Sequence, residues 1–78
     1  MSDTEVNETV DARDMVCTKP LMEVRKAIKP MESGQVLEVL CESVISPSIQ
    51  RVFIQVKKNE LISVEDTGSH IRILMRKA

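Results

Sequence analysis

The chain has two cysteines, and their places in the apolar pattern decide which sulfur chemistry is open to them. Cys17 lies three residues before Pro20, at the start of a predicted amphipathic helix. Free backbone N–H groups and the helix dipole favour an anion at such a place, and thiols there commonly have lowered pKa values. Lys19 adds a positive charge nearby. From position alone, Cys17 is either a reactive thiolate or a small buried side chain.

The other residues with chemical potential have simpler interpretations. Cys41 ends a predicted strand and is interpreted as a core or rim thiol. His70 is the only histidine and begins a predicted strand on its polar face, which favours a solvated ring. One histidine without a Cys-x-x-Cys pair predicts no metal site, and without a glycine-rich phosphate loop we expect no cofactor. Most basic residues are interpreted as ordinary solvated faces: Arg25, Lys26, Lys29, Arg72, Arg76 and Lys77.

The first half of the chain predicts a tail, a strand and a helix. Residues 1–8 are polar and acidic, which predicts a flexible tail before one domain over residues 9–78. Residues 9–13 alternate weakly and predict a short strand. A helix follows, with Thr18 as its N-cap and with Pro30 ending it a turn before Gly34, the expected stop signal. Its apolar stripe is Leu21, Val24, Ile28 and Met31.

The second half predicts three strands and a second helix. The strands are expected at 35–41, 60–65 and 70–77, and the helix begins with Ser46 as N-cap and Pro47 at its first position. The apolar stripe of this helix is Ile49, Val52, Phe53 and Val56. The last strand directs Ile71, Ile73 and Met75 to one face, and His70, Arg72, Leu74 and Arg76 to the other. The order β-α-β-α-β-β predicts an α+β fold, with two helices side by side on one face of a four-stranded sheet.

Length and composition limit the class of protein. The 78 residues make a single domain, and one aromatic residue leaves the core to aliphatic side chains and methionine. A formal charge of −1 and the lack of exposed aromatic residues give no reason to expect direct nucleic-acid binding. No apolar run approaches the ~18 residues of a membrane span. Two cysteines without an export signal predict a cytoplasmic protein.

The chain resembles the TusA/SirA family of small sulfur carriers over residues 9–77. The resemblance rests on Val10-Asp11-Ala12 and on the spacing of these later residues: Cys17, Pro20, Met22, Val24-Arg25-Lys26, Met31, Gly34 and Leu37. The closing Ile-Arg-Ile-Leu-Met-Arg-Lys is also similar to the last strand of the family. Three places depart from the family pattern: Asp14-Met15 replaces Gly-Leu, Thr18 replaces the first of two prolines, and Glu42-Ser43-Val44 lacks a proline.

The resemblance implies both a fold and an activity. The fold is a two-layer sandwich with a mixed four-stranded sheet, similar to the C-terminal domain of initiation factor three. The activity is sulfur carriage, in which Cys17 accepts persulfide sulfur from a cysteine desulfurase or another donor. The carrier then relays it to a downstream acceptor, as in tRNA thiolation or sulfur trafficking. Thr18, Lys19 and Pro20 would support the site, in a monomeric carrier that is not a turnover enzyme on its own.

Two other functions stay open at this point. A thiol redox or regulatory protein would join Cys17 and Cys41 in a reversible disulfide. A non-catalytic interaction module, binding RNA or protein, is suggested by fold analogy alone. We expect Cys17 to lie too far from Cys41 for a bridge, because it follows the first strand by several residues and has already turned toward the helix.

Overall fold

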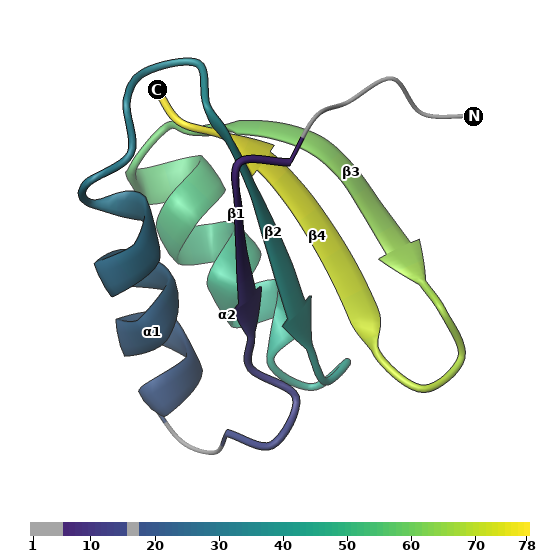
Figure 1. The fold of residues 1–78 in the computed structure, drawn as a ribbon. Coiled ribbons are helices and arrows are strands. Elements are labelled where there is room, and N and C mark those ends of the chain that lie inside the picture. The colour runs from purple at the N-terminus through teal and green to yellow at the C-terminus, as the bar shows by residue number, and fades with distance from the viewer. Residues whose placement is uncertain (1–5, 16–17) are drawn as a thin grey trace.

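The computed structural model describes residues 6–15 and 18–78 as four strands and two helical segments, the second of which changes from α to π geometry (Figure 1). The predicted order of strands and helices is confirmed. The bounds are β1 Glu8–Asp11, α1 Lys19–Ile28, β2 Val36–Cys41, α2 Ser46–Gln50, η1 Arg51–Val56, β3 Glu60–Asp66 and β4 Ile71–Arg76.

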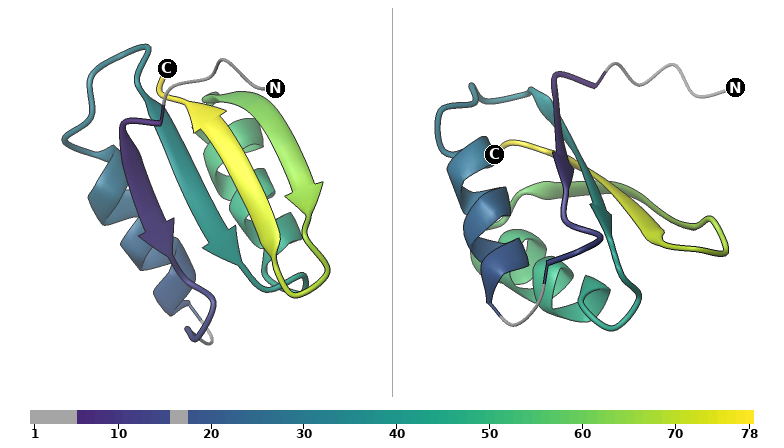
Figure 2. Two further views of the ribbon diagram at one scale, coloured as in Figure 1. Left: turned by 45° about the vertical axis from the view of Figure 1, so that its right-hand side comes forward. Right: turned by 60° about the horizontal axis from the view of Figure 1, so that its bottom comes forward.

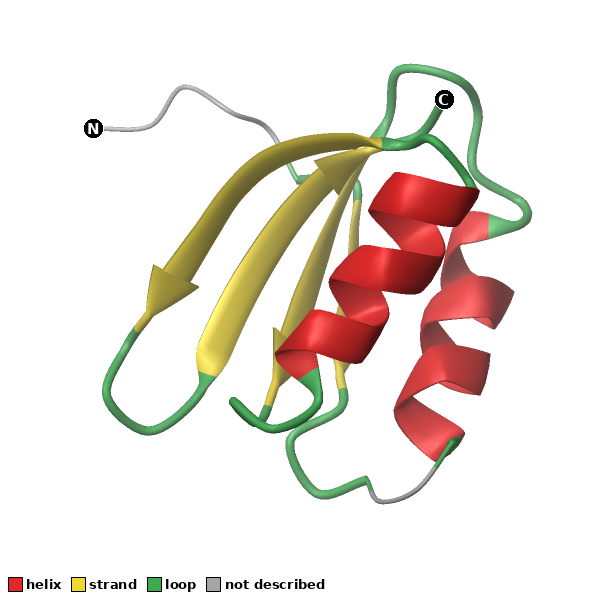
Figure 3. Cartoon of the chain, turned by 180° about the vertical axis from the view of Figure 1, so that it is seen from behind, coloured by secondary structure: helices red, strands yellow, loops and turns green. Residues whose placement is uncertain are grey.

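The four strands form one mixed sheet in the order β1-β2-β4-β3. The pair β1 and β2 is parallel, whereas β4 is antiparallel to both of its neighbours. The helices lie side by side on one face of this sheet, and the other face has no helix (Figures 2 and 3). The structure therefore confirms the predicted two-layer α+β architecture.

The first strand begins closer to the N-terminus than the sequence predicted. Glu8 already pairs with Leu37, and the Asn7 N–H donates to the Val36 carbonyl at 2.9 Å. In return, the Val36 N–H donates to the Asn7 side-chain oxygen at 2.8 Å. Asn7 and Glu8 thus belong to the folded part, while residues 1–5 of the expected tail lie outside the described residues.

The core lies between the sheet and the helices. It takes alternate residues of the two central strands and one stripe from each helical segment, because a strand points every second side chain to the same face. Its most buried members are Val24, Leu37, Val39, Cys41, Ile49, Phe53, Ile73 and Met75. Phe53 is the only aromatic residue in the chain, so this core depends on aliphatic packing, as the composition predicted.

The first helix ends where Pro30 predicts. α1 stops at Ile28, since the Pro30 nitrogen carries no hydrogen to donate to a carbonyl of the preceding turn. Gly34 does not end this helix. It lies in the turn before β2 with a φ of +93°, a conformation that glycine adopts without a steric penalty, and its N–H donates to the Lys77 carbonyl at 2.9 Å.

The second helix differs from its prediction in its N-cap and in the geometry of its last turns. The N-cap is Ile45 rather than Ser46, which is already helical and accepts a hydrogen bond from the Gln50 side chain at 3.0 Å. The predicted inward position of Val56 is wrong, because this side chain is 65% exposed. In η1 the Lys57 N–H reaches back five residues to the Val52 carbonyl, at 3.0 Å. This wider π turn rotates Val56 away from the stripe that a regular helix would continue.

The last strand follows the predicted alternation, and one residue on its outer face is also buried. Ile71, Ile73 and Met75 point to the core, as expected. Leu74 lies on the opposite face by register, as predicted, and is only 2% exposed there. It occupies a central strand, directly between Glu38 on β2 and Ser63 on β3.

Candidate functional site

The connection from β1 to α1 begins with two fixed residues. The Ala12 N–H donates to the Leu40 carbonyl at 2.7 Å, and its side chain is fully buried. Just before it, both oxygens of Asp11 accept hydrogen bonds from the Arg13 guanidinium, at 2.8 and 2.7 Å. These bonds lower the pKa of Asp11 to about 2. The chain thus leaves the sheet in a defined direction.

Cys17, the predicted sulfur-carrying residue, lies outside the described residues together with Val16. Its neighbours in the sequence are described on both sides. Met15 packs against the core, and its N–H donates to the Ala12 carbonyl at 3.3 Å. Thr18, immediately after Cys17, is the N-cap of α1.

The start of α1 holds the three residues that were predicted to support the site. Lys19 is the first helical residue and is exposed, whereas Pro20 is fully buried. Thr18 occupies the N-cap position, but its side chain forms no capping hydrogen bond. A hydroxyl caps a helix best from an extended backbone, and Thr18 has φ −92° and ψ −3°. The prediction that the Thr18 hydroxyl caps the helix is therefore wrong.

Cys41 is a packed thiol, as the sequence predicted. It ends β2 opposite Ile71, its side chain is fully buried, and this burial raises its pKa. A raised pKa keeps the sulfur protonated at neutral pH, and the protonated form is a poor nucleophile. The environment of Cys41 is therefore not the one expected of a reactive cysteine.

His70 lies in the turn between β3 and β4. Its Nδ1 is 3.2 Å from the Thr67 hydroxyl and 3.0 Å from that of Ser69, and the ring is partly buried rather than fully solvated. Within residues 6–15 and 18–78, no three metal-ligating side chains come together. His70 is therefore part of a hydrogen-bonded turn.

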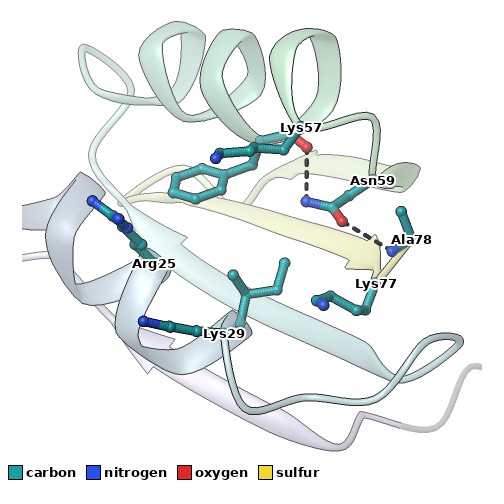
Figure 4. A pocket seen from close by; sticks show the side chains of 8 residues that line it. Arg25, Lys29, Lys57, Asn59, Lys77 and Ala78 are labelled. Carbon is teal, nitrogen blue, oxygen red and sulfur yellow. Dashed lines mark hydrogen bonds between the residues drawn. The ribbon is translucent and has the colours of Figure 1, made fainter.

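The structure divides the basic residues that the sequence analysis treated alike. Arg72 forms ion pairs with Glu38 and with Glu65, and Arg76 pairs with Glu60 at 3.0 Å, all from the helix-free side of the sheet. Arg25, Lys29 and Lys77 instead line one cavity together with Lys57 (Figure 4). The sequence held one weak signal for this cluster, since Arg25 and Lys29 are four residues apart on one helix face.

Comparisons with known proteins agree with this fold and with the family that the sequence resembles. The family model for "Sulfurtransferase TusA" matches residues 8–77. A protein of Archaeoglobus fulgidus described as "Putative sulfur carrier protein" is 35% identical over 68 residues, which are 87% of this chain and 93% of that protein. The chain belongs to the TusA family, and this membership supports a TusA-like sulfur carrier as its class.

A solved structure has the same fold. The SirA-like protein of Desulfitobacterium hafniense superposes with a TM-score of 0.67 and 26% sequence identity, covering 88% of this chain and 95% of that one. In the described part of the present chain, no helix is long and apolar enough to cross a membrane.

Proposed function

We propose that this protein carries sulfur as a persulfide on Cys17. The observation that supports this most is the family match over residues 8–77, which spans a cysteine one residue before the N-cap of α1. The proposed donor is a cysteine desulfurase, and the proposed acceptor is a downstream protein of tRNA thiolation or another sulfur-trafficking route in the cytoplasm.

The proposed transfer is a thiol–persulfide exchange, in which the outer sulfur passes from one cysteine to another. The Cys17 thiolate attacks the outer sulfur of a persulfide on the donor, and a new S–S bond forms on Cys17. The S–S bond of the donor breaks, and its electron pair returns to the donor cysteine as a thiolate. No external oxidant or reductant is needed, because one persulfide is exchanged for another.

The start of α1 supports an anion on Cys17. Backbone N–H groups in the first turn of a helix have no partner within that helix, and the dipole adds partial positive charge there. Pro20 supplies no N–H, so Lys19 and Leu21 are the residues of the first turn that keep this donor. The exposed Lys19 side chain adds a full charge near the same end.

The redox alternative requires a bridge between Cys17 and Cys41. The full burial of Cys41 and its raised pKa disfavour rapid exchange, because a thiolate must form and be reached before a disulfide does. Sulfur carriage places no demand on Cys41. It is therefore the function that the described residues support better.

Intact-mass analysis after incubation with a cysteine desulfurase and cysteine tests the proposal. The wild-type chain and Cys41→Ala are expected to gain the mass of one or more sulfur atoms, and a reductant is expected to remove it. Cys17→Ser is expected to gain none. Equal loading of Cys17→Ser and the wild type would refute the carrier function. Rapid formation of a Cys17–Cys41 bridge under mild oxidation would favour the redox function instead.

A further inference from the structure

A cavity of about 340 Å³ lies between α1, η1 and the segment after β4 (Figure 4). Its apolar lining comes from Ile28 and Phe53. This volume falls within the range of small-molecule sites, which begins at about 300 Å³. The cavity adjoins the C-terminal half of α1, at the other end of that helix from Thr18. It is thus separate from the proposed sulfur site.

Four positively charged side chains line this cavity: Arg25, Lys29, Lys57 and Lys77. No acidic side chain of the described residues lines it with them. In the same part of the chain, none of the four forms an ion pair or donates a side-chain hydrogen bond. Arg72 and Arg76, by contrast, have carboxylate partners. Ala78 also lines the cavity, and its terminal carboxylate supplies one negative charge without forming an ion pair with any of the four. A net positive charge is therefore left for a ligand to neutralise.

Hydrogen bonds to the main chain fix the wall that carries Lys57 and Lys77. The buried Asn59 amide donates to the Phe53 carbonyl at 2.9 Å, and its oxygen accepts from the Ala78 N–H at 3.0 Å. Lys77 itself is held by its N–H, which donates to the Gln35 carbonyl at 2.8 Å. Two cations from distant parts of the chain are thus held beside one cavity by the fold.

Charge at helix ends explains only part of this cluster. Arg25 and Lys29 lie near the end of α1, and Lys57 follows η1, so each complements the negative end of a helix dipole. Lys77 follows β4 and belongs to no helix, yet the cavity places it beside the same two helix ends. Four full positive charges exceed what two helix ends of about half a negative charge each can balance.

We propose that this cavity binds a small organic phosphate with an apolar or planar body, such as a nucleoside diphosphate. Phosphate oxygens accept several charge-assisted hydrogen bonds at once, and one arginine guanidinium can donate to two of these oxygens. Ile28 and Phe53 are only 7% and 2% exposed, so they give the rest of the ligand a small apolar floor rather than a broad face. This binding makes no use of Cys17 and is independent of sulfur carriage.

An NMR titration of ¹⁵N-labelled protein with ADP, pyrophosphate and adenosine tests the proposal. ADP is expected to bind more tightly than either fragment, because only ADP offers both charge and a planar body. The shifts are expected at the amides of Arg25, Lys29, Lys57, Asn59 and Lys77. Cys17→Ser is expected to bind ADP as the wild type does. A lack of ADP-dependent shifts at these amides would overturn the proposal.

Two double variants distinguish a specific binding site from non-specific electrostatic attraction of ADP. Lys57→Gln with Lys77→Gln is expected to weaken ADP binding by at least about tenfold, because each charged contact contributes well over RT. Lys26→Gln with Arg51→Gln removes the same charge from exposed positions outside the cavity and is expected to have little effect. Equal weakening by both pairs would contradict the proposal. So would tighter binding of a short RNA than of ADP at the same amides.

Discussion

The two nitrogen atoms of Arg13 that face Asp11, Nε and Nη2, donate to its two carboxylate oxygens at 2.8 and 2.7 Å. The Arg13 backbone N–H adds a third bond to Asp11, at 3.2 Å. The pair lies where the chain leaves β1 for the segment that contains Cys17. It therefore gives a titratable marker for the geometry of this connection.

We predict that Arg13→Gln raises the pKa of Asp11 from about 2 toward its ordinary value of 3.8. The largest cause of the lowering is the side-chain hydrogen bond from Arg13, which favours the charged carboxylate. A carboxyl NMR titration measures this pKa directly, with Lys26→Gln as a control that leaves the pair intact. An unchanged pKa in Arg13→Gln would show that the pair does not persist in solution.

The same pair sets the sign of a pH effect on stability. A lowered pKa in the folded state stabilises the fold above the unfolded pKa, near 3.8, and this contribution disappears as the pH falls through about 2. We expect the difference in unfolding free energy between wild type and Arg13→Gln to shrink between these two values. Because both side chains are exposed, the effect should decrease at high salt.

Thr18→Val is expected to change the unfolding free energy by less than about 0.5 kcal/mol, because the Thr18 hydroxyl forms no capping hydrogen bond. Thr67→Val is the matched control, since the Thr67 hydroxyl donates to the His70 carbonyl at 2.9 Å. Loss of that bond is expected to cost about 1 kcal/mol. Urea denaturation measures both variants. A loss of 1 kcal/mol or more in Thr18→Val would show that this hydroxyl caps α1 after all.

Cys41 is expected to resist alkylation in the native protein and to react once urea unfolds the chain. Its burial keeps the reagent from reaching the sulfur, and its raised pKa keeps the thiol protonated. Cys41→Ala should lower stability by about 1 kcal/mol through a small loss of packing, while leaving sulfur loading intact. Mass spectrometry of the labelled Cys17→Ser variant, in which Cys41 is the only thiol, follows the reaction. Fast native labelling of that variant would contradict the packed thiol.

Asn59→Ala is expected to lower the unfolding free energy by about 1–2 kcal/mol, because it removes a buried hydrogen bond to the Phe53 carbonyl and a partly buried one from the Ala78 N–H. The Phe53 carbonyl keeps the Asn59 backbone N–H as a donor at 3.1 Å, which limits the loss. Asn7→Ala is a matched control. It removes a bond to the Val36 N–H that is only partly buried, so a smaller loss is expected. Thermal unfolding compares the two. Equal losses would show that the Asn59 bridge adds nothing beyond an ordinary hydrogen bond.

The sequence by itself determined the element order, the fold class and the reactive candidate. Apolar residues recur every three or four positions in α1 and every second position in β4, and these periods follow from the geometry of single segments. Pro30 ended its helix as predicted because the missing N–H is a property of the residue alone. The family motif around Cys17 was likewise visible in the order of residues.

Only the tertiary structure decided how side chains from distant segments meet. The burial of Leu74 depends on the strands that flank β4 on both sides. The same holds for the cavity, where Lys77 joins Arg25 and Lys57 from separate segments. Periodicity assigns a residue to one face of its own helix or strand, whereas burial and charge clustering depend on what packs beside that face.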